Sequence, residues 1–219
     1  MGQEVNLMEN YPQSKRNLEE RAAQRTAEDR AIARRFDQTF FDGDRRYGYG
    51  GFNYHPRFWE PVVPTFIKHY GLTSTSKVLD VGCAKGFMLY DFQRLIPGIT
   101  VAGIDISEYA IANAKEEVKP FVQVADARDL PFEDKSFDLV ISVTTLHNLP
   151  RQDCKRSLQE LERVSRKGKF ITVDAYRSEE EKKRMDMWNL TALTYMHVDE
   201  WQNFFKEAGY TGDYYWFIP

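Results

Sequence analysis

The chain is poor in cysteine, has no long apolar run and carries no basic excess. Its two cysteines, Cys83 and Cys154, lack the C-x-x-C spacing of a metal site or a redox pair. We therefore expect two reduced thiols, as in proteins of a reducing compartment. No apolar run approaches the roughly 18 residues that span a bilayer. Because residues 1–16 also lack the apolar stretch of a signal peptide, the sequence predicts a cytoplasmic protein without a membrane partner.

The charge balance argues against one class of partner. There are 30 Lys and Arg residues against 33 Asp and Glu residues, which gives a formal net charge of -3. Nucleic-acid-binding proteins usually carry a basic excess, so we expect no nucleic-acid partner, while a local basic patch stays compatible with these totals. The 219 residues, 42% of them hydrophobic, fit a single compact domain with a real core.

Two parts of this domain differ in composition. Residues 1–70 form an N-terminal extension, in which Ser14–Arg35 is rich in helix-favouring residues. Phe40–Trp59 mixes glycines with aromatic residues and predicts an ordered loop, and Pro61–Tyr70 predicts a short helix. Residues 71–219 form the main unit.

Strand-like and helix-like segments alternate from Ser76 to Tyr176, which predicts right-handed βαβ units and a parallel sheet. Continuous apolar runs fit strands that are covered on both faces. We therefore expect an α/β fold: a doubly wound, mostly parallel Rossmann-like sheet with helices on both faces, plus an N-terminal cap of helices and an aromatic loop. The expected strands are Lys77–Val81, Val101–Asp105, Phe121–Ala125, Phe137–Val143 and Phe170–Ala175. The expected helices between them are Phe87–Leu95, Glu108–Val118 and Gln152–Arg166.

The most informative stretch joins the first strand to the first of these helices through a glycine-bearing turn. Such a turn brings backbone close to a ligand and points a helix N-terminus at it. The dinucleotide pattern G-x-G-x-x-G, aligned from Gly82, fails at Ala84 and Phe87. The pattern acidic-x-G-x-G-x-G fits better, since Asp80, Gly82 and Gly86 match and Ala84 alone departs. In this loop the chain resembles the class I S-adenosylmethionine-dependent methyltransferases.

The resemblance covers Lys77 to about Tyr176, with a weaker similarity in Glu200–Tyr210. It implies S-adenosylmethionine as the cofactor, with Asp105 accepting hydrogen bonds from the ribose hydroxyls and Asp126 contacting the adenine amino group. Alanine in the loop is tolerated if that position does not need a positive φ. Each acidic residue could instead be a solvated loop residue or a helix cap. The predicted cofactor-binding residues are Asp80, Gly82, Cys83, Ala84, Gly86, Asp105, Ile106, Asp126, Ala127 and Val143.

The reaction of this family requires few specific catalytic residues, so the sequence gives little indication of them. The sulfonium of the cofactor already activates the methyl group, so the protein mainly holds a nucleophile in line and excludes water. His147, after the fourth strand, is the candidate general base because histidine titrates near neutrality. The alternative is a structural histidine that holds the loop. Asp174 and Tyr176, at the end of the fifth strand, are weaker candidates, and no metal site is expected.

The aromatic loop is the second clue to function. Aromatic side chains supply rigid apolar contact with a few polar handles, so we expect this loop to cover the cofactor and form part of the acceptor pocket. The alternative is that its aromatics only pack the N-terminal helices onto the sheet. The predicted substrate-binding residues are Tyr47, Tyr49, Tyr54 and His55 of the loop and Trp188 opposite; Phe52 and Trp59 lie in the same loop.

The C-terminal part departs from the family pattern, in which two strands follow the fifth and the last is antiparallel. We expect helices over Ser178–Leu193 and Asp199–Ala208, with Gly209 as a stop signal, and only one further strand, Tyr214–Ile218. An uncovered sheet edge would be a pairing liability, which predicts a homodimer.

The preferred hypothesis is in-line methyl transfer from S-adenosylmethionine to an O, N or C nucleophile of a small molecule. Three alternatives stay open: an acceptor on a protein or an RNA, a non-catalytic S-adenosylmethionine-binding module, and a nicotinamide-dependent oxidoreductase. The loop mismatches and the lack of a Tyr-x-x-x-Lys pair oppose the oxidoreductase.

Overall fold

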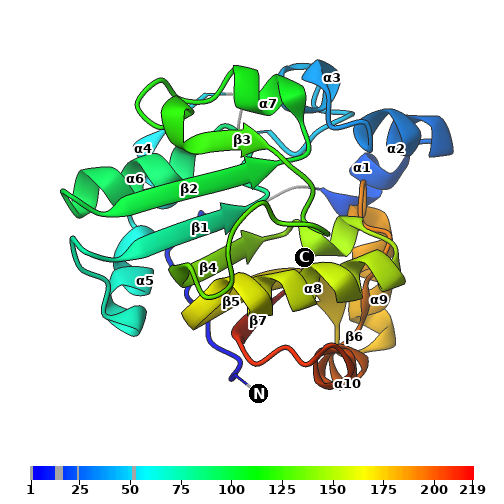
Figure 1. Cartoon of the computed structure of the whole chain (residues 1–219). Coiled ribbons are helices and arrows are strands. Elements are labelled where there is room, and N and C mark those ends of the chain that lie inside the picture. Colours follow the sequence, from blue (N-terminus) through cyan, green and yellow to red (C-terminus); the bar gives the residue numbers. More distant parts are fainter. Residues whose placement is uncertain (1, 13–16, 24, 51–52) are drawn as a thin grey trace.

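A computed structural model describes residues 2–12, 17–23, 25–50 and 53–219. Its centre is a seven-stranded sheet in the order β3-β2-β1-β4-β5-β6, with β7 paired to β5 (Figure 1). Every pairing between these strands is parallel. The predicted doubly wound α/β fold is therefore confirmed. The strands are β1 Lys77–Val81, β2 Thr100–Asp105, β3 Val122–Val124, β4 Phe137–Val143, β5 Ser165–Tyr176, β6 Met196–His197 and β7 Asp213–Phe217.

The central strands are continuous apolar runs, and both of their faces are buried. In β1, Val78 belongs to one buried cluster and Leu79 to another on the opposite face, and both side chains are fully buried. The first cluster is covered by α5 Val63–Tyr70 and α6 Phe87–Leu95, and the second by α8 Arg151–Val164 and α10 Val198–Ala208.

Two helices are shorter than the sequence predicts, because local polar groups end them. Helix α7, Glu108–Ala112, was expected to reach Val118, but the N–H of Lys115 turns away to bond Lys85 O. The N-cap expected at Ser107 is confirmed. Helix α9, Glu179–Trp188, was expected to reach Leu193. Instead, the Asn189 side chain bonds both backbone groups of Ala192 and holds a turn.

The N-terminal part contains more helix than expected. The described part of Ser14–Arg35 forms α1 Leu18–Ala23 and α2 Ala27–Ala33, and a capping box between Thr26 and Asp29 starts α2. Ser14 lies outside the described residues. The expected loop Phe40–Trp59 overlaps α3 Gln38–Asp42 and α4 Pro56–Trp59 at its two ends. Figure 1 shows α1, α2 and α3 on the side toward which the arrowheads of the strands point. Here we call residues 25–50 the cap.

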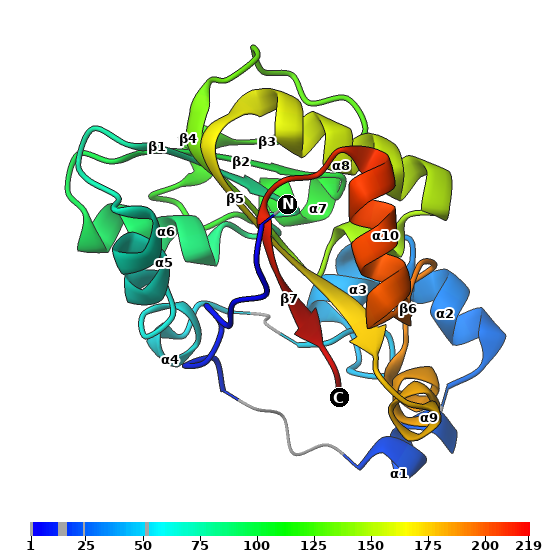
Figure 2. The same cartoon turned by 90° about the horizontal axis from the view of Figure 1, so that it is seen from below.

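The C-terminal strands correct the sequence analysis. The short strand β6 was missed, and the expected last strand is β7, which pairs parallel to β5 and thus departs from the antiparallel last strand of the family pattern. The chain's own N-terminal segment pairs with β7: Val5 N–H donates to Tyr214 O at 2.9 Å, and Tyr214 N–H to Gln3 O at 3.1 Å (Figure 2). The edge that motivated the homodimer is thus partly paired internally, and the homodimer stays a prediction.

The boundary at residue 70 between the N-terminal extension and the main unit also stays a prediction. No helix among the described residues is both long and apolar enough to cross a membrane.

Candidate cofactor site

The turn after β1 puts three residues into the left-handed backbone region. The φ angles are +86° at Gly82, +50° at Ala84 and +73° at Gly86. A Cβ at Gly82 would overlap the side chain of Thr145, and one at Gly86 would lie 2.8 Å from Val118 Cγ2, so both positions require glycine. Alanine was expected to be tolerated in this loop only if its position did not need a positive φ. Ala84 does adopt a positive φ, at a cost of roughly 1–2 kcal/mol.

Hydrogen bonds tie this turn to the end of β2. The N–H groups of Gly82 and Cys83 donate to Ile104 O at 2.8 and 2.9 Å. The N–H of Ala84 donates to Asp105 Oδ2 at 2.8 Å. The Cys83 side chain packs on the sheet, since a Cβ at Gly103 would lie 2.8 Å from its Sγ. Only the backbone of Cys83 is therefore available to a ligand over the turn.

Two buried carboxyl groups lie beside the turn. Asp80 is 5% exposed and Asp105 is 8% exposed. Burial, with a smaller contribution from the charge of Asp105, raises the pKa of Asp80 to about 7. Burial also raises the pKa of Asp105, against hydrogen bonds from the backbone of Ser107 and Ala84. Both carboxyl groups therefore have little contact with solvent, and their negative charges repel each other. Hydroxyl or ammonium groups of a ligand would stabilise the charged forms by donating hydrogen bonds to them.

The geometry at Asp105 fits a ribose diol. Its Oδ1 accepts the Ser107 N–H at 2.9 Å and its Oδ2 accepts the Ala84 N–H. The backbone of Ile106 contributes a third hydrogen bond. A carboxylate has about four lone-pair sites, so Asp105 keeps capacity for a further donor. The next residue, Ile106, is 55% exposed and offers an apolar surface beside the buried carboxylate. A diol acceptor next to an exposed apolar surface is what an adenosine needs, so these residues fit S-adenosylmethionine.

Asp126, after β3, is engaged by an arginine that the sequence analysis missed. Arg128 Nε lies 2.9 and 3.0 Å from the two carboxylate oxygens of Asp126, and Arg128 also reaches Asp153 at 2.9 Å. These hydrogen bonds lower the pKa of Asp126 below its ordinary value. Ala127 and Val143 are half-buried at the same end of the sheet. The proposed adenine contact thus shares its carboxylate with Arg128.

His147 lies in a short 3-10 helix after β4 and is 3% exposed. Its Nδ1 accepts the backbone N–H of Asp174 at 2.9 Å, which leaves the proton of the neutral ring on Nε2. Burial lowers the pKa of His147 to about 3 and raises that of Asp174 to about 8. At neutral pH both groups are therefore held in their neutral forms. This geometry favours the structural alternative over a general base.

The predicted substrate residues separate into two groups. Tyr49 and Trp188 come together, with ring centroids 5.7 Å apart and an interplanar angle of 25°. The Leu190 N–H donates to the Tyr49 hydroxyl at 3.0 Å. Tyr54 instead bonds Asp91 of α6 at 2.8 Å.

His55 is exposed and caps α4 through its ring, and the side chain of Tyr47 lies against Arg46. Phe52 lies outside the described residues.

The segment after α9 links this aromatic pair to His147. The N–H groups of Leu193 and Thr194 both donate to His147 O at 2.9 Å. On its other side, Arg34 of the cap donates to Thr191 O at 3.2 Å. The cap, the segment 189–195 and the loop after β4 are therefore one connected wall beside the carboxyl ends of the strands.

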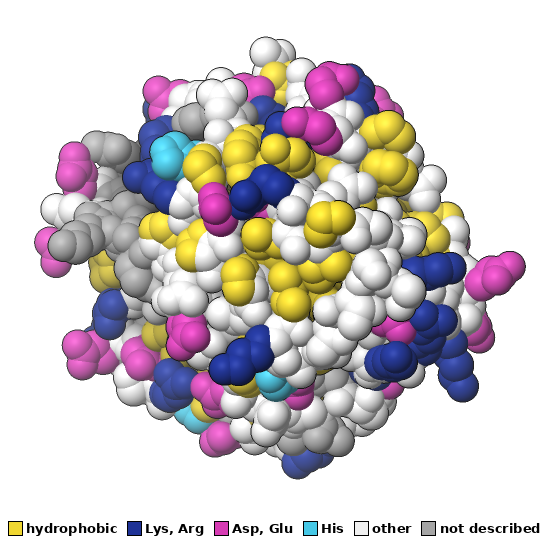
Figure 3. Space-filling view, turned by 90° about the vertical axis from the view of Figure 1, so that its left-hand side faces the viewer, with side chains coloured by type: hydrophobic (Ala, Val, Ile, Leu, Met, Phe, Trp, Pro, Cys, Tyr) yellow, Lys and Arg dark blue, Asp and Glu magenta, His cyan; other side chains and the backbone are white. Residues whose placement is uncertain are grey.

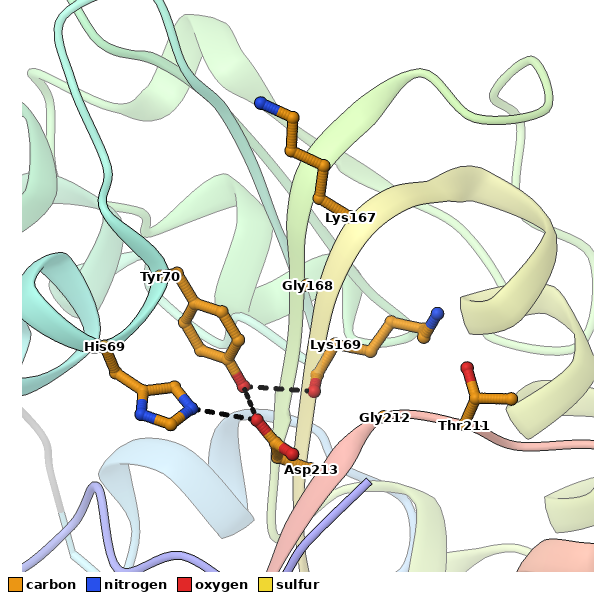
Figure 4. A pocket seen from close by; sticks show the side chains of 8 residues that line it. All are labelled: His69, Tyr70, Lys167, Gly168, Lys169, Thr211, Gly212 and Asp213. Carbon is orange, nitrogen blue, oxygen red and sulfur yellow. Dashed lines mark hydrogen bonds and ion pairs between the residues drawn. The ribbon is translucent and has the colours of Figure 1, made fainter. Parts of the chain in front are cut away.

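A hollow of about 320 Å³ lies elsewhere, at the amino ends of β5 and β7 (Figure 4). Its polar groups bond one another: Asp213 Oδ2 accepts the Tyr70 hydroxyl at 3.0 Å and lies 2.9 Å from His69 Nε2. Tyr70 also lies 3.1 Å from Lys169 O. On the face shown in Figure 3, apolar side chains gather across the middle and upper part, with side chains of both charge signs among and around them. Across the described ranges, no group of His, Cys, Asp and Glu is arranged to hold a metal ion.

Comparison with known proteins assigns the family. Residues 79–173 match a family model described as a methyltransferase domain. A tRNA (carboxymethyluridine(34)-5-O)-methyltransferase of Arabidopsis thaliana is 32% identical over 142 residues, 64% of this chain and 33% of the relative. A demethylmenaquinone methyltransferase of Staphylococcus aureus is 34% identical over 110 residues, 48% of this chain and 45% of the relative.

A solved structure, the YcgJ protein from Bacillus subtilis, shares the fold with a TM-score of 0.54 and 20% identity. The alignment covers 67% of this chain and 66% of that one. The chain spans a third to under half of the two curated relatives. Residues 79–173 therefore belong to the methyltransferase domain family, and the cofactor this family implies is S-adenosylmethionine.

Proposed function

We propose that the protein binds S-adenosylmethionine at the turn after β1 and transfers its methyl group to a small-molecule acceptor. One observation carries the cofactor assignment: the left-handed turn at Gly82, Ala84 and Gly86 is bonded to a buried Asp105 that keeps acceptor capacity. Neighbouring Ile106 offers an exposed apolar surface for a nucleobase.

When bound, the cofactor supplies a methyl group already activated by a sulfonium. The protein's task is then to orient two molecules and to exclude water, which can account for roughly 7–11 kcal/mol of barrier lowering in favourable cases. Asp105 would hold the ribose and Asp126 the adenine amino group. The turn backbone would hold the amino-acid portion of the cofactor beside Asp80.

The acceptor would lie against the wall formed by the cap and the segment 189–195. The stacked pair Tyr49 and Trp188 supports an acceptor with a flat or apolar body, and Leu193 in the same wall is 48% exposed. Tyr47, Tyr54 and His55 remain weaker substrate candidates, since the contacts of Tyr54 and His55 lie with α6 and α4.

We retain His147 as a residue of the reaction site, with a positioning role favoured by its contacts. Its backbone oxygen accepts two N–H groups of the acceptor wall, and its ring accepts the Asp174 N–H. A His147→Gln variant keeps an acceptor and a donor on the side chain. We expect its turnover to fall less than tenfold with an unchanged pH profile; a loss of 10²–10⁴-fold, the scale of a general base, would restore the base assignment.

An RNA acceptor is the second candidate, because the Arabidopsis relative is named for a tRNA substrate. The formal net charge of -3 argues against it. The two candidates differ in salt dependence: turnover on an RNA would fall steeply between low and physiological salt, and turnover on a neutral small molecule would change little.

Calorimetric titration tests the cofactor assignment. We expect S-adenosylmethionine and S-adenosylhomocysteine to bind at one site per chain and NAD to show no binding. Saturable NAD binding without any response to the two sulfur nucleosides would sink the proposal.

A further inference from the structure

The cap is fastened to the cofactor turn by a charged contact that the proposed chemistry does not use. Both carboxylate oxygens of Asp42, the last residue of α3, accept hydrogen bonds from Lys85 Nζ, at 2.6 and 2.7 Å. The Tyr109 hydroxyl of α7 donates to Asp42 Oδ2 at 2.6 Å. Lys85 stands between Ala84 and Gly86, so one end of this contact is the cofactor turn itself.

The two partners of this ion pair differ in burial. The Lys85 side chain is 7% exposed, whereas Asp42 is an exposed residue whose side chain is 27% exposed. Removing the Asp42 carboxylate leaves the buried Lys85 ammonium with less compensation, which costs more than breaking an ion pair whose two partners are both exposed. Asp42 therefore favours the arrangement in which Lys85 points from the turn toward the cap.

A second contact fastens the cap to the other wall of the same site. The Ser107 hydroxyl donates to Phe36 O, and the Ser107 N–H donates to Asp105 Oδ1 at 2.9 Å. Phe36 has a φ of +50°, a conformation that a side chain of this size adopts only under constraint. One residue thus holds both the proposed ribose carboxylate and the start of α3.

We propose that Asp42 is a positioning residue for the cofactor: by binding Lys85 and Tyr109 it holds the cap closed over the nucleoside and slows cofactor release. This inference rests on the proposed cofactor site. Because turn, ribose carboxylate and cap share Lys85 and Ser107, cap closure and cofactor binding are energetically linked, and a change in one changes the other by the same factor.

The test compares two variants with the same change of charge. Asp42→Asn weakens the contact with Lys85. Asp44→Asn, two residues away and exposed, keeps an oxygen that can accept the Arg46 N–H, as Asp44 does at 2.8 Å. Release of S-adenosylhomocysteine is followed by stopped-flow fluorescence. We expect a release rate about tenfold or more above the parent for Asp42→Asn, as for loss of a charged hydrogen bond, and within twofold of the parent for Asp44→Asn.

A double-mutant cycle distinguishes a specific effect of the Asp42–Lys85 contact from a general destabilisation of the cap. In a Lys85→Met background, Asp42→Asn should accelerate release by no more than a few fold, since only its contact with Tyr109 is left to weaken. Equal acceleration in both backgrounds, or release rates that match in Asp42→Asn and Asp44→Asn, would overturn the proposal.

Two further measurements keep the test decisive. If Asp42→Asn fails to fold, Tyr109→Phe removes one hydrogen bond from Asp42 and should accelerate release by a few fold. An unchanged release rate in that variant then contradicts the proposed role of Asp42. A parent protein that binds neither sulfur nucleoside contradicts the proposed function instead, so the two failures are distinguishable.

Discussion

The two ends of the sheet hold similar residue types but use them differently. At the amino end, Asp213 accepts bonds from Tyr70 and from the Gln3 N–H and lies 2.9 Å from His69, so its capacity is largely filled within the chain. At the carboxyl end, Asp80 and Asp105 are buried with raised pKa values. The hollow is at the satisfied end, and the strained turn is at the other. Unfilled bonding capacity, more than open volume, therefore marks the candidate site.

The sharpest way to break this comparison uses two glycines with similar backbone strain. Gly82 has φ +86° at the carboxyl end, and Gly71 has φ +61° at the amino end. A Cβ overlaps Thr145 at Gly82 and meets nothing within 4 Å at Gly71. We expect Gly82→Ala to weaken S-adenosylmethionine binding about 100-fold or more by calorimetry, because the turn must move.

Gly71→Ala is the control for strain alone. It should lower the free energy of unfolding by about 1–2 kcal/mol and leave cofactor affinity unchanged. If both variants lose affinity equally, the two ends are not functionally different.

A smaller effect is expected when one carboxylate is removed from each end. Asp105→Ala should raise the dissociation constant of S-adenosylmethionine about 10- to 150-fold, because it removes a charged acceptor. This corresponds to a loss of roughly 1.5–3 kcal/mol of binding free energy. Asp213→Ala should lower the thermal midpoint of unfolding without altering that constant. Unchanged affinity in Asp105→Ala would mean that the ribose contact is misplaced.

The pH dependence of stability should follow the buried acids of the carboxyl end. The pKa of Asp174 is about 8 in the folded chain against about 3.9 unfolded, so the folded state holds the proton longer and stability is lost as pH rises toward 8. His147 is neutral in the folded state but still titrates near pH 6.5 in the unfolded state. It is present in both the parent and the Asp174→Asn variant, so its contribution cancels in the difference between them.

Between pH 6.5 and 8, urea denaturation should therefore show the parent losing stability relative to Asp174→Asn, by up to roughly 1.4 kcal/mol per pH unit. Asp80 is present in both proteins and cancels in the difference. Parallel pH curves for parent and variant would contradict the raised pKa of Asp174.

The smallest effect is expected at Ala84, where the strained turn keeps a side chain. Ala84→Gly removes a left-handed alanine with φ +50° and should raise the free energy of unfolding by about 1 kcal/mol. Cofactor affinity should change by no more than a few fold, since the Asp105 bond comes from the backbone. A loss of stability would show that the alanine methyl packs usefully.

Prediction from sequence succeeded where a short range of residues decides the outcome. The limits of β1, α6 and β4 match the expected ones, because each is an apolar run bounded by turn or cap residues. It failed where side chains end an element early, as Asn189 does after α9, and at β6, which is two residues long. The parallel direction of β7 depends on the path of α10, which no local pattern encodes.

Within the candidate site, the turn and Asp105 were predictable because strand ends in a parallel sheet meet at one edge. The separation of Tyr54 from Tyr49 was not, since their partners Asp91 and Trp188 lie far apart in the chain. The ion pairs of Asp126 with Arg128 and of Asp42 with Lys85 were also missed.

The sequence by itself determined the order of the main strands and helices, the family and the turn that we propose as the cofactor site, because these follow from periodicity, glycine and the spacing of acidic residues. Only the tertiary structure decided which groups are buried and with whom. Burial sets the pKa of His147 and Asp174, and long-range contact pairs Asp42 with Lys85. Desolvation and charge pairing depend on neighbours distant in the chain, so they arise only when the chain is folded.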